Sequence, residues 1–319
     1  MPNNQAGTRI ATFCLLMRHR SFAIVATTLT MLVSGLTAVV AFPRPALPPV
    51  ASSPRPPHTA DYSPASVLRN NLLVAWYGNP WTGRMGVLGR FTGTALADGL
   101  NRQADAYKKV TRKSVLPAYE LIAVVAQAQP GPDGRYRRRE TREVIERTLR
   151  QARAAGFKLV LDIQTGRSSV MPELAYLAPY LAEPDVYLAL DPEFSMGSDG
   201  VPGRRIGTMR ASEVNDAIAV LEWVMAAHHL PPKVLIVHQF TTGMLPDKEA
   251  IWTSPRLDVV LDMDGFGSPE LKRHSYRTVL RQRELEFTGF KLFYIQDTNM
   301  LEPSQVLALN PQPAVIIYQ

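Results

Sequence analysis

The chain carries a series of short apolar runs, each of which ends in polar residues. The clearest is Val186–Glu193, where five apolar residues are followed by Asp191, a proline and Glu193. An apolar run of this length is too short for a buried helix and is typical of a strand that is buried on both faces. Polar residues gathered at the carboxyl ends of parallel strands mark a functional rim, so the pattern predicts where a site lies.

Eight segments combine such a run with flanking turn signals and predict β-strands. The predicted strands are Leu72–Tyr77, Tyr119–Val125, Lys158–Ile163, Val186–Asp191, Val234–Phe240, Val259–Met263, Leu292–Gln296 and Ala314–Tyr318. Helical periodicity occupies the intervals between them. The predicted helices are Ala95–Thr111, Glu140–Ala155, Pro172–Leu181, Glu213–Leu230, a short Lys248–Trp252, Pro269–Arg281 and Glu302–Leu309.

The alternation of strand and helix indicates an α/β protein with a parallel sheet. Eight strands within about 250 residues are typical of a single (β/α)8 barrel, the TIM-barrel fold. An open doubly wound sheet is the competing architecture, but no glycine-rich phosphate-binding sequence follows the first predicted strand, Leu72–Tyr77. We therefore predict a closed barrel.

The first part of the chain differs in composition from the rest. Residues 21–42 contain no charged residue and follow the basic segment Arg18–Arg20. The run is long enough to span a membrane, and it also ends in small residues that suit a signal peptidase. We expect a signal peptide or membrane anchor at residues 1–42, a proline-rich disordered linker at 43–67, and the barrel domain at 68–319.

The charges around the apolar run predict the side of the membrane on which the barrel lies. Positively charged residues stay preferentially on the cytoplasmic side, and here Arg18–Arg20 precede the run. The barrel is therefore expected outside the cytoplasm, either secreted or anchored to the outer face of the cytoplasmic membrane. The single cysteine, Cys14, excludes an intramolecular disulfide, so stability has to come from packing.

The net charge of +7 would favour nucleic acid as a partner if it were concentrated on the barrel. Residues 1–67 hold five arginines and one acidic residue, which leaves 30 basic and 27 acidic residues in the remainder. Such a balanced surface does not indicate a nucleic-acid-binding protein. The expected partner is a carbohydrate or cell-wall polymer, together with the membrane if the N-terminal segment is retained.

Acidic and aromatic side chains are interleaved where the predicted strands end. The candidate substrate-binding residues are Tyr77, Trp81, Asp162, Gln164, His238, Asp262, Asp264 and Phe266. Carboxylates bind hydroxyl groups, and flat rings pack on the apolar faces of sugars. The combination favours a neutral, polyhydroxylated substrate.

Asp191 and Glu193 are the candidate catalytic residues. Cleavage of a glycoside needs one carboxyl group that stays protonated as a general acid, and a second group that acts as base, nucleophile or orienter. Side chains two apart on a strand share a face, and a like charge nearby raises the pKa of a carboxyl group. Asp191 is therefore predicted to help Glu193 keep its proton near neutral pH.

The sequence Asp191-Pro-Glu193 at the end of the fourth predicted strand resembles the Asp-x-Glu ending of chitinase-type and muramidase-type glycoside hydrolases. In those enzymes the Glu is the proton donor and the Asp assists it, so the resemblance implies these roles here. It covers this one strand, because the places of further acidic and glycine residues in chitinases hold Val186, Tyr187 and Ala189. The resemblance therefore leaves the sugar and the linkage open.

Two other functions fit the same residues. A carboxylate cluster with His238 could hold a divalent metal ion, which would make the protein a metal-dependent hydrolase. No His-x-His or His-Glu-x-x-His sequence supports this, so no metal and no other cofactor is expected. The second alternative is a non-catalytic barrel that binds glycan or cell wall, because a fold does not determine a function.

Overall fold

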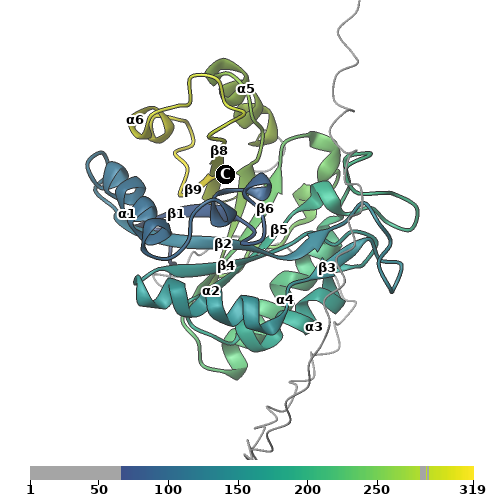
Figure 1. The fold of residues 1–319 in the computed structure, drawn as a ribbon. Helices are drawn as coiled ribbons and strands as arrows, with labels where there is room; N and C mark the ends of the chain where they lie inside the picture. The colour runs from purple at the N-terminus through teal and green to yellow at the C-terminus, as the bar shows by residue number, and fades with distance from the viewer. Residues whose placement is uncertain (1–65, 281–284, 286) are drawn as a thin grey trace, which may run out of the picture. The chain divides into compact units, whose positions relative to one another are not determined.

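The computed structural model describes residues 66–280, 285 and 287–319 (Figure 1). The segments predicted as signal peptide or anchor and as linker lie outside the described residues, apart from Ser66 and Val67. No helix among those described is long and apolar enough to cross a membrane. The predictions about residues 1–67 therefore stay predictions.

Eight parallel strands close into a barrel. They are β1 (Asn71–Gly78), β2 (Ser114–Ala126), β4 (Lys158–Ile163), β5 (Val186–Leu190), β6 (Lys233–Gln239), β7 (Leu257–Met263), β8 (Phe287–Leu292) and β9 (Val315–Tyr318). Each strand pairs with the next in this order, and β1 pairs with both β2 and β9, which closes the cylinder. The predicted α/β class and closed parallel barrel are confirmed.

Helices follow most of the strands and pack against the outside of the barrel (Figure 1). They are α1 (Thr94–Lys108), α2 (Arg142–Ala154), α3 (Val170–Leu181), α4 (Ala211–Ala227), α5 (Pro269–Leu280) and α6 (Pro303–Leu307). Between β6 and β7 the chain forms only short 3₁₀ helices, at Thr242–Met244 and Lys248–Ala250. The short helix predicted at Lys248–Trp252 is therefore a single 3₁₀ turn.

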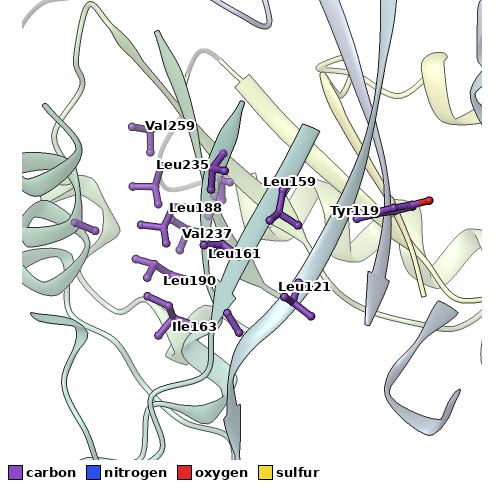
Figure 2. Packing of buried hydrophobic residues seen from close by; sticks show 14 of the residues in the cluster. Tyr119, Leu121, Leu159, Leu161, Ile163, Leu188, Leu190, Leu235, Val237 and Val259 are labelled. Atoms are coloured by element: carbon purple, nitrogen blue, oxygen red, sulfur yellow. The ribbon is translucent and has the colours of Figure 1, made fainter. Parts of the chain in front are cut away.

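Alternate residues of the strands build two apolar cores. On the outer face, Leu159 and Leu161 of β4 lie beside Leu188 and Leu190 of β5 in the layer between strands and helices (Figure 2). The inner face fills the barrel with a second cluster that includes Leu73, Ala75, Ala118, Val160, Ala189, Ile236, Val260 and Ile317. Successive side chains of a strand point to opposite faces, so one continuous apolar run supplies both cores.

Toward the carboxyl ends of the strands, the inner positions become polar. The buried residues that continue the inward alternation are Tyr77, Glu120, Asp162, Asp191, His238, Asp262 and Lys291. Burial of a charged group is unfavourable unless the group is paired and hydrogen-bonded. This half of the barrel therefore depends on specific polar contacts rather than on apolar packing.

β8 differs from the prediction for this part of the chain. The strand runs over Phe287–Leu292, whereas Leu292–Gln296 was predicted, and Tyr294 and Ile295 are 37% and 71% exposed in the following loop. The prediction was wrong because the loop is more apolar than the strand, which is interrupted by a glycine and a lysine. As a result, Lys291 stands at the carboxyl end of β8 rather than at its beginning.

The sequence pattern also did not predict β3 (Arg137–Arg139), which pairs with β2 in antiparallel orientation. Arg137 and Arg139 form ion pairs with the buried Glu173 at 2.9 and 2.7 Å. Three consecutive arginines do not resemble a strand, because the carboxylate that balances two of them lies on a distant helix, while Arg138 pairs with Glu140.

Gly289 of β8 leaves room for the side chain of Asp262, since a Cβ atom at position 289 would collide with its carboxylate. We expect Gly289→Val to lower the free energy of unfolding by about 1–3 kcal/mol, the usual effect of overpacking. Urea unfolding of the full chain measures this. Gly243→Ala is the control, because a Cβ atom there meets nothing within 4 Å. Equal stability of the two variants would contradict the prediction.

Candidate functional site

A cavity of about 270 Å³ lies at the carboxyl ends of the strands. The residues that line it are Tyr77, Arg84, Met85, Ile122, Ala126, Gln164, Asp191, Glu193, Phe194, Asp264, Lys291, Phe293 and Gln319. The structure thus brings together Tyr77, Gln164, Asp191, Glu193 and Asp264 of the residues singled out in the sequence. The cavity therefore lies at the rim of the barrel where the active site of a parallel barrel is expected.

Asp191 follows the last residue of β5 and begins the 3₁₀ turn Pro192–Phe194. Its Oδ1 accepts a hydrogen bond from the backbone N–H of Glu193 at 3.2 Å. The two residues therefore do not share one face of a strand, as their spacing had suggested. Instead, Asp191 caps the turn that carries Glu193, and both side chains line the cavity.

Glu193 is only partly buried, at the wall of the cavity. Burial raises the pKa of Glu193 from 4.5 to about 7, and the negative charge of Asp264 adds to this effect. Lys291 and His238 act in the opposite direction but do not outweigh the increase. The sequence had pointed to Asp191; the charge of Glu193 does raise the pKa of Asp191, but the carboxylate that raises the pKa of Glu193 is Asp264. Near neutral pH, a large part of Glu193 carries its proton.

Hydrogen bonds connect Asp191 to the wall formed by β1. Gln164 Nε2 donates to Asp191 Oδ2 at 3.2 Å and to the Tyr77 hydroxyl at 3.1 Å. The Tyr77 hydroxyl in turn donates to Asp162 Oδ2 at 3.1 Å. Burial and the charge of Asp162 raise the pKa of Asp191 well above its usual range. Asp191 is therefore held in place from two sides, through its backbone turn and through Gln164.

Lys291 brings an ammonium group into this acidic site. Its Nζ forms an ion pair with Asp264 Oδ2 at 3.0 Å and lies 3.7 Å from the centroid of the Tyr77 ring. Burial lowers the pKa of Lys291, but the charges of Asp264 and of neighbouring carboxylates outweigh this and raise it above the usual value. Lys291 therefore keeps its positive charge and holds the Asp264 carboxylate at the cavity.

Three of the predicted binding residues, Asp162, His238 and Asp262, are fully buried and do not line the cavity. His238 Nδ1 lies 2.9 Å from Asp262 Oδ2, and His238 Nε2 lies 3.0 Å from Glu120 Oε1. Asp162 is linked to the cavity by the hydrogen bond that its Oδ2 accepts from the Tyr77 hydroxyl. In this arrangement these residues can influence a ligand only through the side chains above them.

Sequence reasoning missed Glu120 and Lys291. Glu120 is the only charged residue of β2, and it alternates with Ala118 and Ile122 of the inner cluster. An isolated charge at an inward position of an apolar strand was therefore a usable signal. Lys291 was missed because the boundary of β8 was misplaced, which put this lysine at the wrong end of the strand.

Phe266 and Trp81, two of the aromatic residues predicted to bind the substrate, differ in position. Phe266 is 59% exposed, and its ring packs edge-on against Phe293 of the cavity wall, with 5.8 Å between the ring centroids. Trp81 is 58% exposed but does not line the cavity, and its indole N–H donates to the buried Glu140 at 2.7 Å. Phe266 is therefore the better placed of the two.

Neither a model of a known protein family nor a curated protein sequence matches this chain. The resemblance to chitinase-type and muramidase-type enzymes is limited to Asp191-Pro-Glu193. A function must therefore be inferred from the arrangement of the side chains at the cavity.

Proposed function

We propose that this protein is a glycoside hydrolase in which Glu193 is the general acid. One observation carries the proposal: Glu193 lines a cavity at the mouth of the barrel, and its pKa is raised to about 7. A carboxyl group with such a pKa keeps its proton near neutral pH and can deliver it to the oxygen of the departing sugar. Proton transfer of this kind is the step that an ordinary glutamate could not perform at pH 7.

Asp264 supports the proposal as the second carboxylate. It lines the same cavity and forms an ion pair with Lys291, whose ammonium group balances its charge. Glycoside cleavage combines a protonated carboxyl group with a charged one that acts as nucleophile or as base toward water. In this proposal Asp264 has that role, and Asp191 orients the turn on which Glu193 stands.

The other side chains at the cavity favour a carbohydrate over other substrates. Gln164 and the carboxylates offer hydrogen-bond partners for hydroxyl groups, and Phe293 with Phe266 offers apolar ring surface next to them. Sugars present both kinds of surface. The basic segment before residues 21–42 adds the expectation that the enzyme acts outside the cytoplasm, where cell-wall polymers are accessible.

The test is turnover of a panel of neutral polysaccharides and peptidoglycan by the full chain, with new reducing ends as the readout. On the substrate that is cleaved, we expect kcat/KM to fall as the pH rises through about 7. The proton on Glu193 is present below its pKa of about 7 and is lost above it. A rate that keeps rising between pH 6 and pH 9 would contradict the assignment of the acid.

The same panel decides between catalysis and binding. Saturable binding of a glycan by the wild type without any release of reducing ends would support the non-catalytic alternative. When a product is formed, the configuration of its anomeric carbon shows whether Asp264 acts as nucleophile, with retention, or as base, with inversion.

A further inference from the structure

Below the cavity, two carboxylates and an imidazole converge inside the barrel. Glu120 of β2, Asp162 of β4 and His238 of β6 are all fully buried. One oxygen of each carboxylate and one ring nitrogen of His238 lie within 4.8 Å of one another. Each of these groups therefore comes from a different strand, and all three meet at one point of the interior.

Two oxygens of this cluster have no hydrogen-bond donor. Within the described part of the chain, the buried atoms without a partner include Glu120 Oε2 and Asp162 Oδ1. Buried polar atoms are nearly always satisfied, and an exception calls for an ion, a water molecule or a shared proton. Carboxylate oxygens are charged acceptors, so a cation is the partner that satisfies them best.

His238 limits which partner can satisfy the buried oxygens of this cluster. Its two nitrogens face the carboxylates of Asp262 and Glu120 at 2.9 and 3.0 Å. A neutral imidazole has one N–H and can donate to only one of them, so the other nitrogen needs either a second proton or a metal ion. The second proton would satisfy Glu120 Oε1 but would leave Glu120 Oε2 and Asp162 Oδ1 without a partner.

We propose that Glu120, Asp162 and His238 bind one divalent transition-metal ion, through both oxygens of Glu120, Oδ1 of Asp162 and Nε2 of the imidazole, so that Glu120 Oε2 and Asp162 Oδ1 gain a partner. Donor atoms that share such an ion at about 2.1 Å lie about 3–3.5 Å apart, and His238 Nε2 is 3.0 Å from Glu120 Oε1. His238 Nδ1–H then donates to Asp262, the carboxylate contact that commonly orients a metal-bound histidine.

The donor set determines the class of metal. An imidazole nitrogen together with carboxylates suits Zn²⁺, Fe²⁺ or Mn²⁺, whereas Ca²⁺ and Mg²⁺ take oxygen ligands. The nearby ammonium group of Lys291 does not replace the ion, because its Nζ is paired with Asp264. The charge of Lys291 also acts on Glu120 and Asp162, and a divalent ion would add a cation bound directly to both.

The ion would act as a structural element beneath the cavity. It would join β2, β4 and β6 across the interior, where the apolar cluster ends. It would also fix Asp162, whose second oxygen accepts the Tyr77 hydroxyl of the cavity wall. This inference does not depend on the proposed function, since Glu193 and Asp264 are not among the ligands.

The experiment measures metal content and thermal unfolding of the full chain, purified without a metal-affinity resin. We expect about one Zn²⁺, Fe²⁺ or Mn²⁺ per chain. Treatment with a chelator should remove the ion and lower Tm by several degrees, because a ligand that binds only the folded state stabilises it. Added Zn²⁺ should restore Tm, and added Mg²⁺ should not.

Substitutions of the proposed ligands test whether the ion binds inside the barrel. Glu120→Gln should bind Zn²⁺ at least about 10-fold more weakly and lose the chelator-dependent change in Tm. Asp162→Asn provides the same test if Glu120→Gln does not fold. The matched control is Asp258→Asn, because Asp258 is a buried carboxylate of β7 whose Oδ2 is satisfied by the N–H of Leu68. It should bind Zn²⁺ like the wild type.

Two outcomes would overturn the proposal. The first is a wild-type chain that retains no metal and whose Tm does not change with chelator or Zn²⁺. In that case, ¹⁵N NMR should show His238 protonated on both nitrogens, held by Asp262 and Glu120. The second is Glu120→Gln or Asp162→Asn binding Zn²⁺ as tightly as Asp258→Asn, which would place the ion elsewhere.

Discussion

Replacement of Glu193 by glutamine should lower kcat on the glycan by about 10²- to 10⁴-fold, the usual contribution of a general acid. Glutamine has the same shape but cannot release a proton at this pH. The turn should be preserved, because Asp191 bonds to the backbone N–H of residue 193 and not to its side chain. Steady-state kinetics on the substrate found in the polysaccharide panel, with thermal unfolding as a check on the fold, measures the effect.

A substrate with a better leaving group gives a sharper form of this test. An aryl glycoside whose phenolate departs without protonation does not need the acid, so Glu193→Gln should cleave it at nearly the wild-type rate of bond breaking. Glu146→Gln on α2 is the control, since that side chain is 50% exposed and faces Arg150. Equal losses on both substrates, or wild-type activity on the glycan, would exclude Glu193 as the proton donor.

Replacement of Lys291 by methionine should lower the free energy of unfolding by about 3–5 kcal/mol, as expected when one partner of a buried ion pair is removed. Methionine keeps much of the length of the side chain but removes the ammonium group 3.0 Å from Asp264 Oδ2. Asp264 is 9% exposed and would then keep only the longer contact of its Oδ2 with His238 Nδ1, at 3.6 Å. Chemical denaturation of wild type and variant measures the difference.

A double-mutant cycle separates the ion pair from packing. Asp264→Asn, added to Lys291→Met, should restore part of the lost free energy of unfolding. The reason is that no uncompensated charge is left at position 264. The control pair is Lys108 and Asp105, which are 2.9 Å apart but more than half exposed. Lys108→Met should change stability by no more than about 1 kcal/mol. Equal effects of the two lysine substitutions would contradict the electrostatic explanation.

The barrel could be predicted because its strands carry a local signal. β5 is apolar along its whole length and β6 is apolar over residues 234–237, and the position where each run becomes polar marks its carboxyl end. The same signal failed for β8, where Gly289 makes room for Asp262 and Lys291 pairs with Asp264. Both residues weaken the apolar pattern because of their partners, Asp262 on β7 and Asp264 directly after it.

The rim position of Asp191, Glu193 and Asp264 was therefore determined by sequence alone, since alternation and apolar run length are local properties of a strand. The sequence alone did not determine the chemical role of each carboxylate. The pKa of Glu193 follows from burial and from Asp264, which directly follows β7, and Glu120 meets His238 across 118 residues of chain. Desolvation and charge pairing depend on distances in space, and only the closure of the barrel brings these groups together.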